Sequence, residues 1–288
     1  MNHSTVKSFT FGIGLFFTLP LVYGNSSSPS SSDGTLYINK SKTHKVAPVK
    51  YGFHYEEIGM MGEGALHAEL IRNRSFEEAT PPAGLSVKNG LYENVPAPRV
   101  KEKKVFQVDP LIGWTTYPLS YTPVFISRTD ENPMSGENKY SMLVNVTEDI
   151  ANHPDALILN RGYYGMNLKT DTSYRLSLFL KNRNYSAPLR VFLVDEWGQR
   201  VSNVIEVNVG NRDWTKYTGE LKPEKNVRRG MFAIQPMSKG QFQIDVVSLF
   251  PSDTWNDGKS VFRKDIVQNL KEFSPSFIRF PGGCIVNG

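Results

Sequence analysis

An acidic pair, Glu56 and Glu57, directly follows the β-branched and aromatic run VAPVKYGFHY. Two carboxyl groups can supply a nucleophile and a general acid, or an acid and a base, when both face the same bond of a substrate. Adjacent residues of a strand point to opposite sides, so Glu56 and Glu57 cannot face one bond together. The pair is suited to accepting hydrogen bonds from a polar ligand or pairing with an arginine, and not to serving as two catalytic carboxylates.

A second cluster that could take part in chemistry is the stretch IRFPGGC near the other end of the sequence. Arg279 can orient hydroxyls or carboxylates through its fork of donors, or form an ion pair in a core. Gly282 and Gly283 either let a ligand approach the backbone or simply make a turn. Cys284 is the only cysteine, which excludes an internal disulfide, and no histidine stands in a recognisable motif that would activate it. We expect Cys284 to line a pocket or to be an inert, buried thiol.

No metal or cofactor is expected at either cluster. His54, His67 and His153 do not have the spacing of zinc ligands. The carboxylates Asp195, Glu196 and Asp245 lack the spacing of an EF-hand, so a calcium site in their region is left open without being predicted.

The elements that must position these residues alternate between strand and helix. The run VAPVKYGFHY reads as a strand, and GEGALHAELIRNRSFE, rich in helix formers, predicts a short helix after it. Near the C-terminus, KSVFRKDIVQNLKEF places Phe262, Ile266, Leu270 and Phe273 on one face of a helix, which the Ser-Pro pair ends before the strand SFIRF. Ligands of parallel α/β sheets gather at the C-terminal ends of strands, so both clusters are expected to meet at one edge.

The sequence between these parts reads as an antiparallel β-sandwich. Seven short runs alternate with turns and show no helical period; they are YSMLVNV, SYRLSLFLK, LRVFLVD, SNVIEVNV, WTKYTGEL, RGMFAIQP and GQFQIDVVSLF. Within SYRLSLFLK, the residues Tyr174, Leu176, Leu178 and Leu180 share one face, which is typical of a half-buried strand. The four tryptophans are expected to be mainly core residues of this sandwich.

The N-terminus predicts export. A weakly basic start is followed by the apolar run FTFGIGLFFTLPLVYG, too short to span a bilayer, and small residues precede a polar Ser/Pro tract, as in a cleaved signal peptide. The expected location is secreted or extracytoplasmic, with no membrane contact after cleavage. The net charge of +5 comes from scattered basic residues, which argues against nucleic-acid binding. The oligomeric state is not predicted.

The predicted fold class is α/β plus all-β, with the first two units of a (β/α)8 barrel interrupted by an antiparallel β-sandwich. The two α/β stretches are far shorter than the roughly 250 residues of a barrel, so the chain is expected to be a fragment. The predicted boundaries are a signal peptide at 1–24, a linker at 25–35, the barrel start at 36–80, the sandwich at 81–250 and the second barrel unit at 251–288.

Two stretches resemble a known enzyme family. YGFHYEEIGMMGEGALHAELIRNRSFE is similar to the opening of the glycoside hydrolase family 51 α-L-arabinofuranosidases, where a first barrel strand ends in an acidic pair. FRKDIVQNLKEFSPSFIRFPGGCIVNG is similar to that family's second barrel unit. The run of strands between them is similar in position and strand pattern to the family's inserted sandwich, which implies a sandwich of the jelly-roll, carbohydrate-binding type.

The resemblance implies a retaining hydrolase that releases terminal α-L-arabinofuranosyl groups from arabinose-containing plant polysaccharides, without a cofactor. It implies that Glu56, Arg279 and Cys284 contact the sugar. The family's two catalytic glutamates stand on its fourth and seventh barrel strands, so no catalytic residue is expected before Gly288, and the 288 residues alone are expected to be inactive. The alternatives are a secreted carbohydrate-binding module without hydrolase activity, and an adhesion sandwich without a sugar ligand.

Overall fold

The computed structural model describes residues 51–56, 60–78 and 109–280, the backbone of three short strands between residues 85 and 107, and five single positions between residues 38 and 45. The chain divides into two compact units, residues 1–47 and 48–288, and the second holds all the elements below. The predicted signal peptide and linker lie outside the described residues. Among the residues described, every helix is too short or too polar to span a bilayer.

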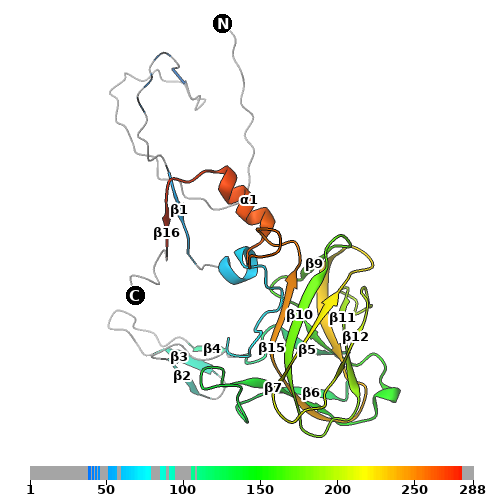
Figure 1. Cartoon of the computed structure of the whole chain (residues 1–288). Helices are drawn as coiled ribbons and strands as arrows, with labels where there is room; N and C mark the ends of the chain where they lie inside the picture. Colours follow the sequence, from blue (N-terminus) through cyan, green and yellow to red (C-terminus); the bar gives the residue numbers. More distant parts are fainter. Residues whose placement is uncertain are drawn as a thin grey trace, which may run out of the picture. The chain divides into compact units, whose positions relative to one another are not determined.

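Two antiparallel sheets make up most of the second unit, as predicted (Figure 1). The five-stranded sheet has the order β13 (Thr215–Leu221), β10 (Tyr174–Asn182), β15 (Gly240–Pro251), β7 (Ser141–Val146) and β6 (Val124–Thr129). The six-stranded sheet has the order β12 (Ile205–Asn208), β11 (Pro188–Val194), β14 (Val227–Gln235), β8 (Leu157–Asn160) and β5 (Trp114–Tyr117), and β9 (Met166–Leu168) pairs with β14. All seven predicted runs are strands, and their antiparallel pairing confirms the sandwich.

Alternating side chains explain why these runs form strands. In β10, Tyr174, Leu176, Leu178 and Leu180 are each at most 3% exposed, while the residues between them are more exposed. They join one core with the inward side chains of both sheets, among them Val144, Ile244, Val191 and Phe232. Burying an apolar side chain of this size contributes about 1.5–3 kcal/mol, so the alternation fixes the register of the strands.

A small three-stranded antiparallel sheet precedes the sandwich strands. It consists of β2 (Leu85–Lys88), β3 (Leu91–Asn94) and β4 (Val105–Gln107). A single 3-10 turn, η2 (Ile150–Asn152), begins at Asp149, whose carboxylate accepts a hydrogen bond from the amide of Ala151. Neither element was predicted from the sequence.

The helix predicted after Glu57 is wrong for most of its length. Only one π-helical turn, η1 (Gly62–Leu66), forms, and the chain then runs extended beside β15. The amide of Leu70 donates to the carbonyl of Leu249 (3.1 Å), and the amide of Val247 donates to the carbonyl of Arg74 (2.9 Å). These tertiary hydrogen bonds override the local helix propensity, which is worth only a few tenths of a kcal/mol per residue.

The tryptophans differ in their environments. Trp114 is 6% exposed and donates from its indole nitrogen to the carbonyl of Asn73 (3.1 Å), as expected for a core residue. Trp197 is 73% exposed, so the expectation of a core position is wrong there. It stands in the turn after β11, where its amide donates to the carboxylate of Asp195 (3.1 Å).

Asp245 is a fully buried carboxyl group within β15. Its carboxylate accepts hydrogen bonds from the amide of Val246 (2.7 Å) and the side-chain amide of Asn138 (2.7 Å), and its exposure is 0%. Burial disfavours the charged form and raises the pKa of Asp245 from 3.8 to about 7. Val246 adopts a positive φ of 44°, which a β-branched residue seldom does.

The raised pKa predicts a pH dependence of stability. The folded protein binds a proton at Asp245 that the unfolded chain has already lost, so the free energy of unfolding should fall as pH rises from about 4 to about 7 and level off above. The contribution is at most about 4 kcal/mol, at about 1.4 kcal/mol per unit of pKa. We expect Asp245→Asn to reduce this dependence, measured by urea unfolding at pH 4.5, 6 and 7.5, while the buried Glu69, whose pKa is also raised, keeps its own contribution in both proteins. The exposed control Asp155→Asn should keep it; an unchanged slope in Asp245→Asn would contradict the assignment.

Candidate functional site

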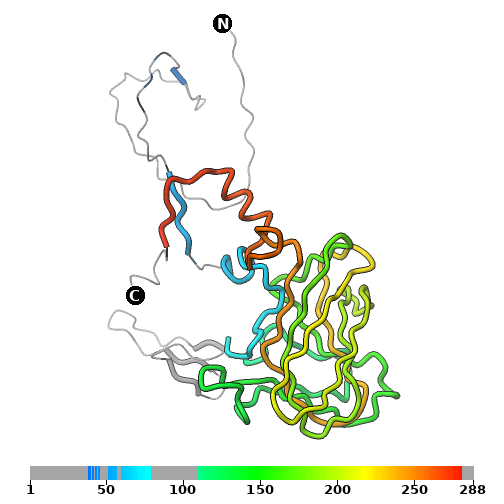
Figure 2. The backbone as a smooth tube through the Cα atoms, in the orientation of Figure 1, coloured from blue at the N-terminus to red at the C-terminus, as the bar shows by residue number. Residues whose placement is uncertain are grey.

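Two short parallel strands join the segments on either side of the sandwich. β1 (Phe53–His54) pairs with β16 (Ile278–Arg279), with Phe53 opposite Ile278 and His54 opposite Arg279. The amide of Phe53 donates to the carbonyl of Phe277, and that of Tyr55 donates to the carbonyl of Arg279, both at 3.0 Å. Figure 2 shows the two strands side by side, although more than 200 residues separate them in the sequence. This is the pairing that the sequence predicted.

The pairing brings two of the predicted site residues to one edge. Paired residues of a parallel ladder point to the same side, so the side chains of His54 and Arg279 share a face, and Glu56 stands two residues after His54, just beyond the end of β1. Tyr55 and Phe280 lie on the opposite face, where their ring centroids are 5.5 Å apart. Glu56 is half-buried and Arg279 is exposed. The other predicted residues, Glu57, Gly282, Gly283 and Cys284, lie outside the described residues.

Close backbone approach at Gly52 allows β1 to reach β16. A Cβ atom added at Gly52 would lie 2.5 Å from the ring and from the carbonyl oxygen of Phe277. The neighbouring contacts reinforce the approach: the amide of Ser276 donates to the carbonyl of Tyr51 (2.9 Å), and the rings of Phe53 and Phe273 meet edge to face at 5.9 Å.

We therefore expect Gly52→Ala to separate the two strands. Hydrogen exchange at the amides of Phe53 and Tyr55 should accelerate by about 10-fold or more, which corresponds to at least 1.4 kcal/mol of lost local stability. Gly210→Ala is the matched control, because a Cβ atom there meets nothing within 4 Å. Equal exchange rates in the two variants would show that the strands do not depend on this contact.

The single α-helix of the described residues begins close to η1. α1 (Lys264–Glu272) follows a short antiparallel bridge between His67 and Phe262, in which the amide of Ala68 donates to the carbonyl of Val261 and the amide of Arg263 to that of Leu66. Ile266 and Leu270 are half-buried on the predicted face, but Phe262 precedes the helix and Phe273 is 53% exposed. In the first turn, Arg263 binds both oxygens of Asp265 (3.1 and 2.5 Å), and this hydrogen bonding lowers the pKa of Asp265.

A cavity of about 710 Å³, here called the junction cavity, lies among η1, the start of α1 and the residues that flank β9. Its lining includes His67, Tyr163, Tyr164 and Gln268. Burial and the neighbouring Glu63 raise the pKa of Tyr163, and burial lowers the pKa of His67, so both are neutral at pH 7. The cavity therefore combines these two uncharged groups and an exposed tyrosine with charged lining residues, among them Lys169, Asp253 and Lys264.

The most heavily bonded carboxylate of this region, that of Glu69, was not predicted from the sequence. Glu69 is 4% exposed, and its carboxylate accepts hydrogen bonds from the amides of Ile71 (3.0 Å) and Leu249 (2.8 Å) and from the hydroxyl of Ser248 (2.6 Å). Burial raises the pKa of Glu69 despite these bonds. The only signal in the sequence was its place within the apolar run ALHAELI, where an unpaired charge would be costly.

Comparison with known proteins gives the class of this chain. No protein-family model matches it. The chain is 28% identical over 243 residues to α-L-arabinofuranosidase 1 of Arabidopsis thaliana, covering 83% of this chain and 32% of the relative. It is 27% identical over 239 residues to the extracellular exo-α-L-arabinofuranosidase of Streptomyces chartreusis, covering 82% of this chain and 24% of the relative.

The solved structure of an arabinose-bound family 51 α-L-arabinofuranosidase has the same fold over the matched part. It superposes with a TM-score of 0.62 at 24% identity, over 85% of this chain and 36% of that one. The fold and sequence thus place the chain among relatives of glycosidases. More closely, it is homologous over most of its length to the α-L-arabinofuranosidases of glycoside hydrolase family 51, and it spans about a third or less of the length of these relatives.

Proposed function

We propose that this chain forms part of the substrate pocket of an exported α-L-arabinofuranosidase, which releases terminal α-L-arabinofuranosyl groups from arabinose-containing plant polysaccharides with retention of configuration. The observation that carries the proposal is the parallel pairing of β1 with β16, because it brings Glu56 and Arg279 to one edge. The homology to family 51 enzymes supports the choice of sugar.

In this proposal, β1, α1 and β16 belong to the start of a (β/α)8 barrel, and the sandwich is inserted between β1 and α1. Barrel enzymes bind substrate at the C-terminal ends of their strands, which is where Glu56 and Arg279 stand. The domain boundaries predicted from the sequence are part of this proposal. So is secretion, which is supported by the extracellular relative from Streptomyces chartreusis.

The residues of the edge are assigned to binding and not to bond cleavage. A retaining glycosidase needs two carboxyl groups about 5–5.5 Å apart, one as nucleophile and one as acid/base. We assign Glu56 to accepting hydrogen bonds from sugar hydroxyls, Arg279 to orienting hydroxyls or carboxylates, and Cys284 to lining the pocket. The two catalytic glutamates are assigned to other strands of the barrel.

The test of the activity uses the protein expressed from its complete gene. We expect it to release 4-nitrophenol from the α-L-arabinofuranoside and not from the α-L-arabinopyranoside, because the pocket selects the furanose ring. Proton NMR of the first product should show the α-anomer, as a retaining mechanism requires. No release from the furanoside, or release of the β-anomer, would overturn the proposal.

The 288 residues expressed alone give a second prediction. Because we place Glu56 on hydroxyl groups and not on the bond that breaks, we expect these residues to hydrolyse no aryl arabinofuranoside above the rate of a buffer blank. The measurement is a long incubation at high protein concentration. Turnover that disappears in Glu56→Gln and persists in the exposed control Glu196→Gln would show that Glu56 is a catalytic carboxylate.

A carbohydrate-binding module without hydrolase activity is the second candidate. The observation that favours it is a groove on the outer face of the five-stranded sheet, whose lining includes no residue of β1 or β16. Retention of the whole protein on an arabinoxylan column, together with no release of arabinose from any substrate, would select this candidate over the hydrolase.

A further inference from the structure

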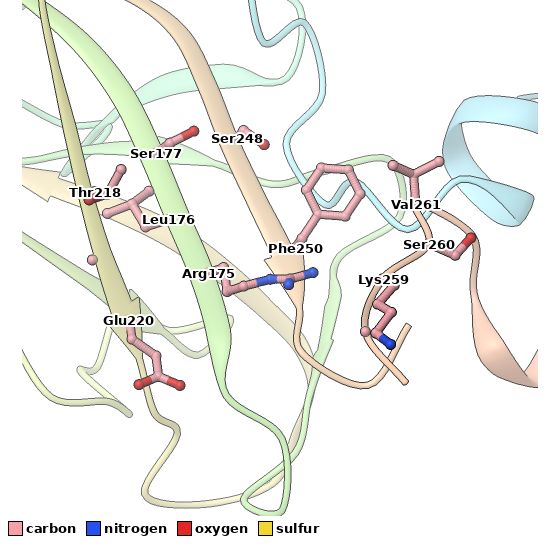
Figure 3. A pocket seen from close by; sticks show the side chains of 12 residues that line it. Arg175, Leu176, Ser177, Thr218, Glu220, Ser248, Phe250, Lys259, Ser260 and Val261 are labelled. Carbon is pink, nitrogen blue, oxygen red and sulfur yellow. The ribbon is translucent and has the colours of Figure 1, made fainter. Parts of the chain in front are cut away.

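A groove of about 660 Å³, here called the sheet groove, lies on the outer face of the sandwich. Its floor is formed by β13, β10 and β15, and one wall is formed by residues 258–261 (Figure 3). Arg175 and Ser177 point to this face, because their neighbours in β10, Tyr174, Leu176 and Leu178, are buried in the core. The groove is therefore built on the most regular part of the fold.

The strand registers order the floor into two rows. In the first row, Ser177 stands opposite Thr218 of β13 and Ser248 of β15, which places three hydroxyl side chains across three strands. In the second row, Arg175 stands opposite Glu220 and Phe250. The floor therefore combines small hydroxyl residues with an aromatic ring, and the hydroxyls of Ser177 and Thr218 remain for a ligand because that of Ser248 donates to Glu69 (2.6 Å).

The charges of the groove are not balanced. Its charged lining residues are Arg175, Lys259 and Glu220. Within the described part of the chain, neither Arg175 nor Lys259 makes an ion pair, whereas Glu220 pairs with Lys222 (3.4 Å). Figure 3 shows the Arg175 side chain extending past the Phe250 ring toward the loop that carries Lys259 and Ser260, while the Glu220 carboxylate points away.

We propose that the sheet groove binds a uronic-acid residue of a plant polysaccharide. The sugar carboxylate lies between the guanidinium of Arg175 and the ammonium of Lys259, the ring packs on Phe250, and its hydroxyls face Ser177 and Thr218. An arginine fork matches the geometry of a carboxylate, and such charge-assisted hydrogen bonds are about twice as strong as neutral ones. The proposal rests on the proposed function only for the choice of a plant polysaccharide.

The direct test is calorimetric titration of the chain with trigalacturonic acid and with its fully methyl-esterified form, which has the same rings and linkages without charge. We expect the acid to bind with a dissociation constant near the millimolar range and the ester at least about 10-fold more weakly, which is about 1.4 kcal/mol. Binding of the acid should weaken further between 20 and 200 mM NaCl, since salt screens exposed charges.

Matched variants locate the site. Arg175→Gln and Lys259→Gln should each lower the affinity for the acid by about 5- to 10-fold, within the range of a charge-assisted hydrogen bond. Arg190→Gln, which removes a half-buried arginine of β11 that pairs with Glu206 (3.3 Å), should change nothing. Circular dichroism confirms that each variant is folded, and Lys259 stands in a loop where folding is least at risk.

The outcomes separate this proposal from the hydrolase. Equal binding of acid and ester, full affinity in both groove variants, or no binding at about 10 mM acid would each overturn the uronate site, and would leave the arabinofuranosidase assay untouched. Conversely, Glu56→Gln should bind trigalacturonic acid as tightly as the unchanged chain does. Uronate binding without arabinofuranosidase activity would overturn the proposed function alone.

Discussion

Replacing Glu69 by alanine should lower the free energy of unfolding by about 3–5 kcal/mol, because it leaves two buried amides and one hydroxyl without an acceptor, at about 1–3 kcal/mol for each unsatisfied group. The amides belong to Ile71 and Leu249, and the hydroxyl to Ser248. For a chain of this size, each kcal/mol lowers the melting temperature by about 2–4 °C, so the expected fall is about 10 °C. Differential scanning calorimetry or urea unfolding at pH 7 measures it.

Two variants make this test specific to the hydrogen bonds. Glu69→Gln keeps an acceptor oxygen for the amides, and its NH₂ group can donate to the Ser248 hydroxyl, so we expect a loss of only about 1 kcal/mol. Glu196→Ala removes an exposed glutamate and should change stability by less than about 0.5 kcal/mol. If Glu69→Ala were no less stable than Glu196→Ala, the extended segment beside β15 would not be held by this carboxylate.

The second large effect is expected at Glu56 in the protein expressed from its complete gene. Glu56→Gln keeps the size of the side chain but removes its charge, and each lost charge-assisted hydrogen bond to a sugar hydroxyl is worth about 1.5–3 kcal/mol. We therefore expect kcat/KM for an aryl α-L-arabinofuranoside to fall by about 10- to 100-fold.

The kinetic parameters distinguish binding from catalysis at Glu56. A residue that contacts the bound sugar should leave measurable kcat with a raised KM, whereas a catalytic carboxylate would lose kcat by several orders of magnitude. Arg279→Lys, which keeps the charge but not the fork of donors, should also lower kcat/KM. Glu196→Gln should match the unchanged protein. A full rate in Glu56→Gln would remove this residue from the pocket.

The sandwich was predictable because its signal is local. The alternation in β10 is complete from Tyr174 to Leu180, and a one-residue shift would expose the whole row. The parallel pairing of β1 with β16 was also predictable. Ligand-binding residues of parallel α/β sheets gather at the C-terminal ends of the strands, and this rule placed both distant segments at one edge.

Features that depend on distant partners were not predictable. The run HAELI has helix formers at helical spacing, yet it is extended because the carboxylate of Glu69 and the amide of Leu70 find partners in β15, about 180 residues away. The lining of the sheet groove likewise comes from three strands and a loop, which carry Arg175, Thr218, Phe250 and Lys259. No short motif marks such a set, so only the folded register reveals it.

The central claim is that the edge formed by β1 and β16 holds the terminal arabinofuranosyl group. The most direct measurement is a crystal structure, with bound L-arabinose, of the protein expressed from its complete gene. We predict a furanose ring whose hydroxyls lie within about 3.2 Å of the Glu56 carboxylate, with the Arg279 guanidinium on the same side. Arabinose bound only in the sheet groove or the junction cavity, with Glu56 bonded to protein groups alone, would contradict the claim.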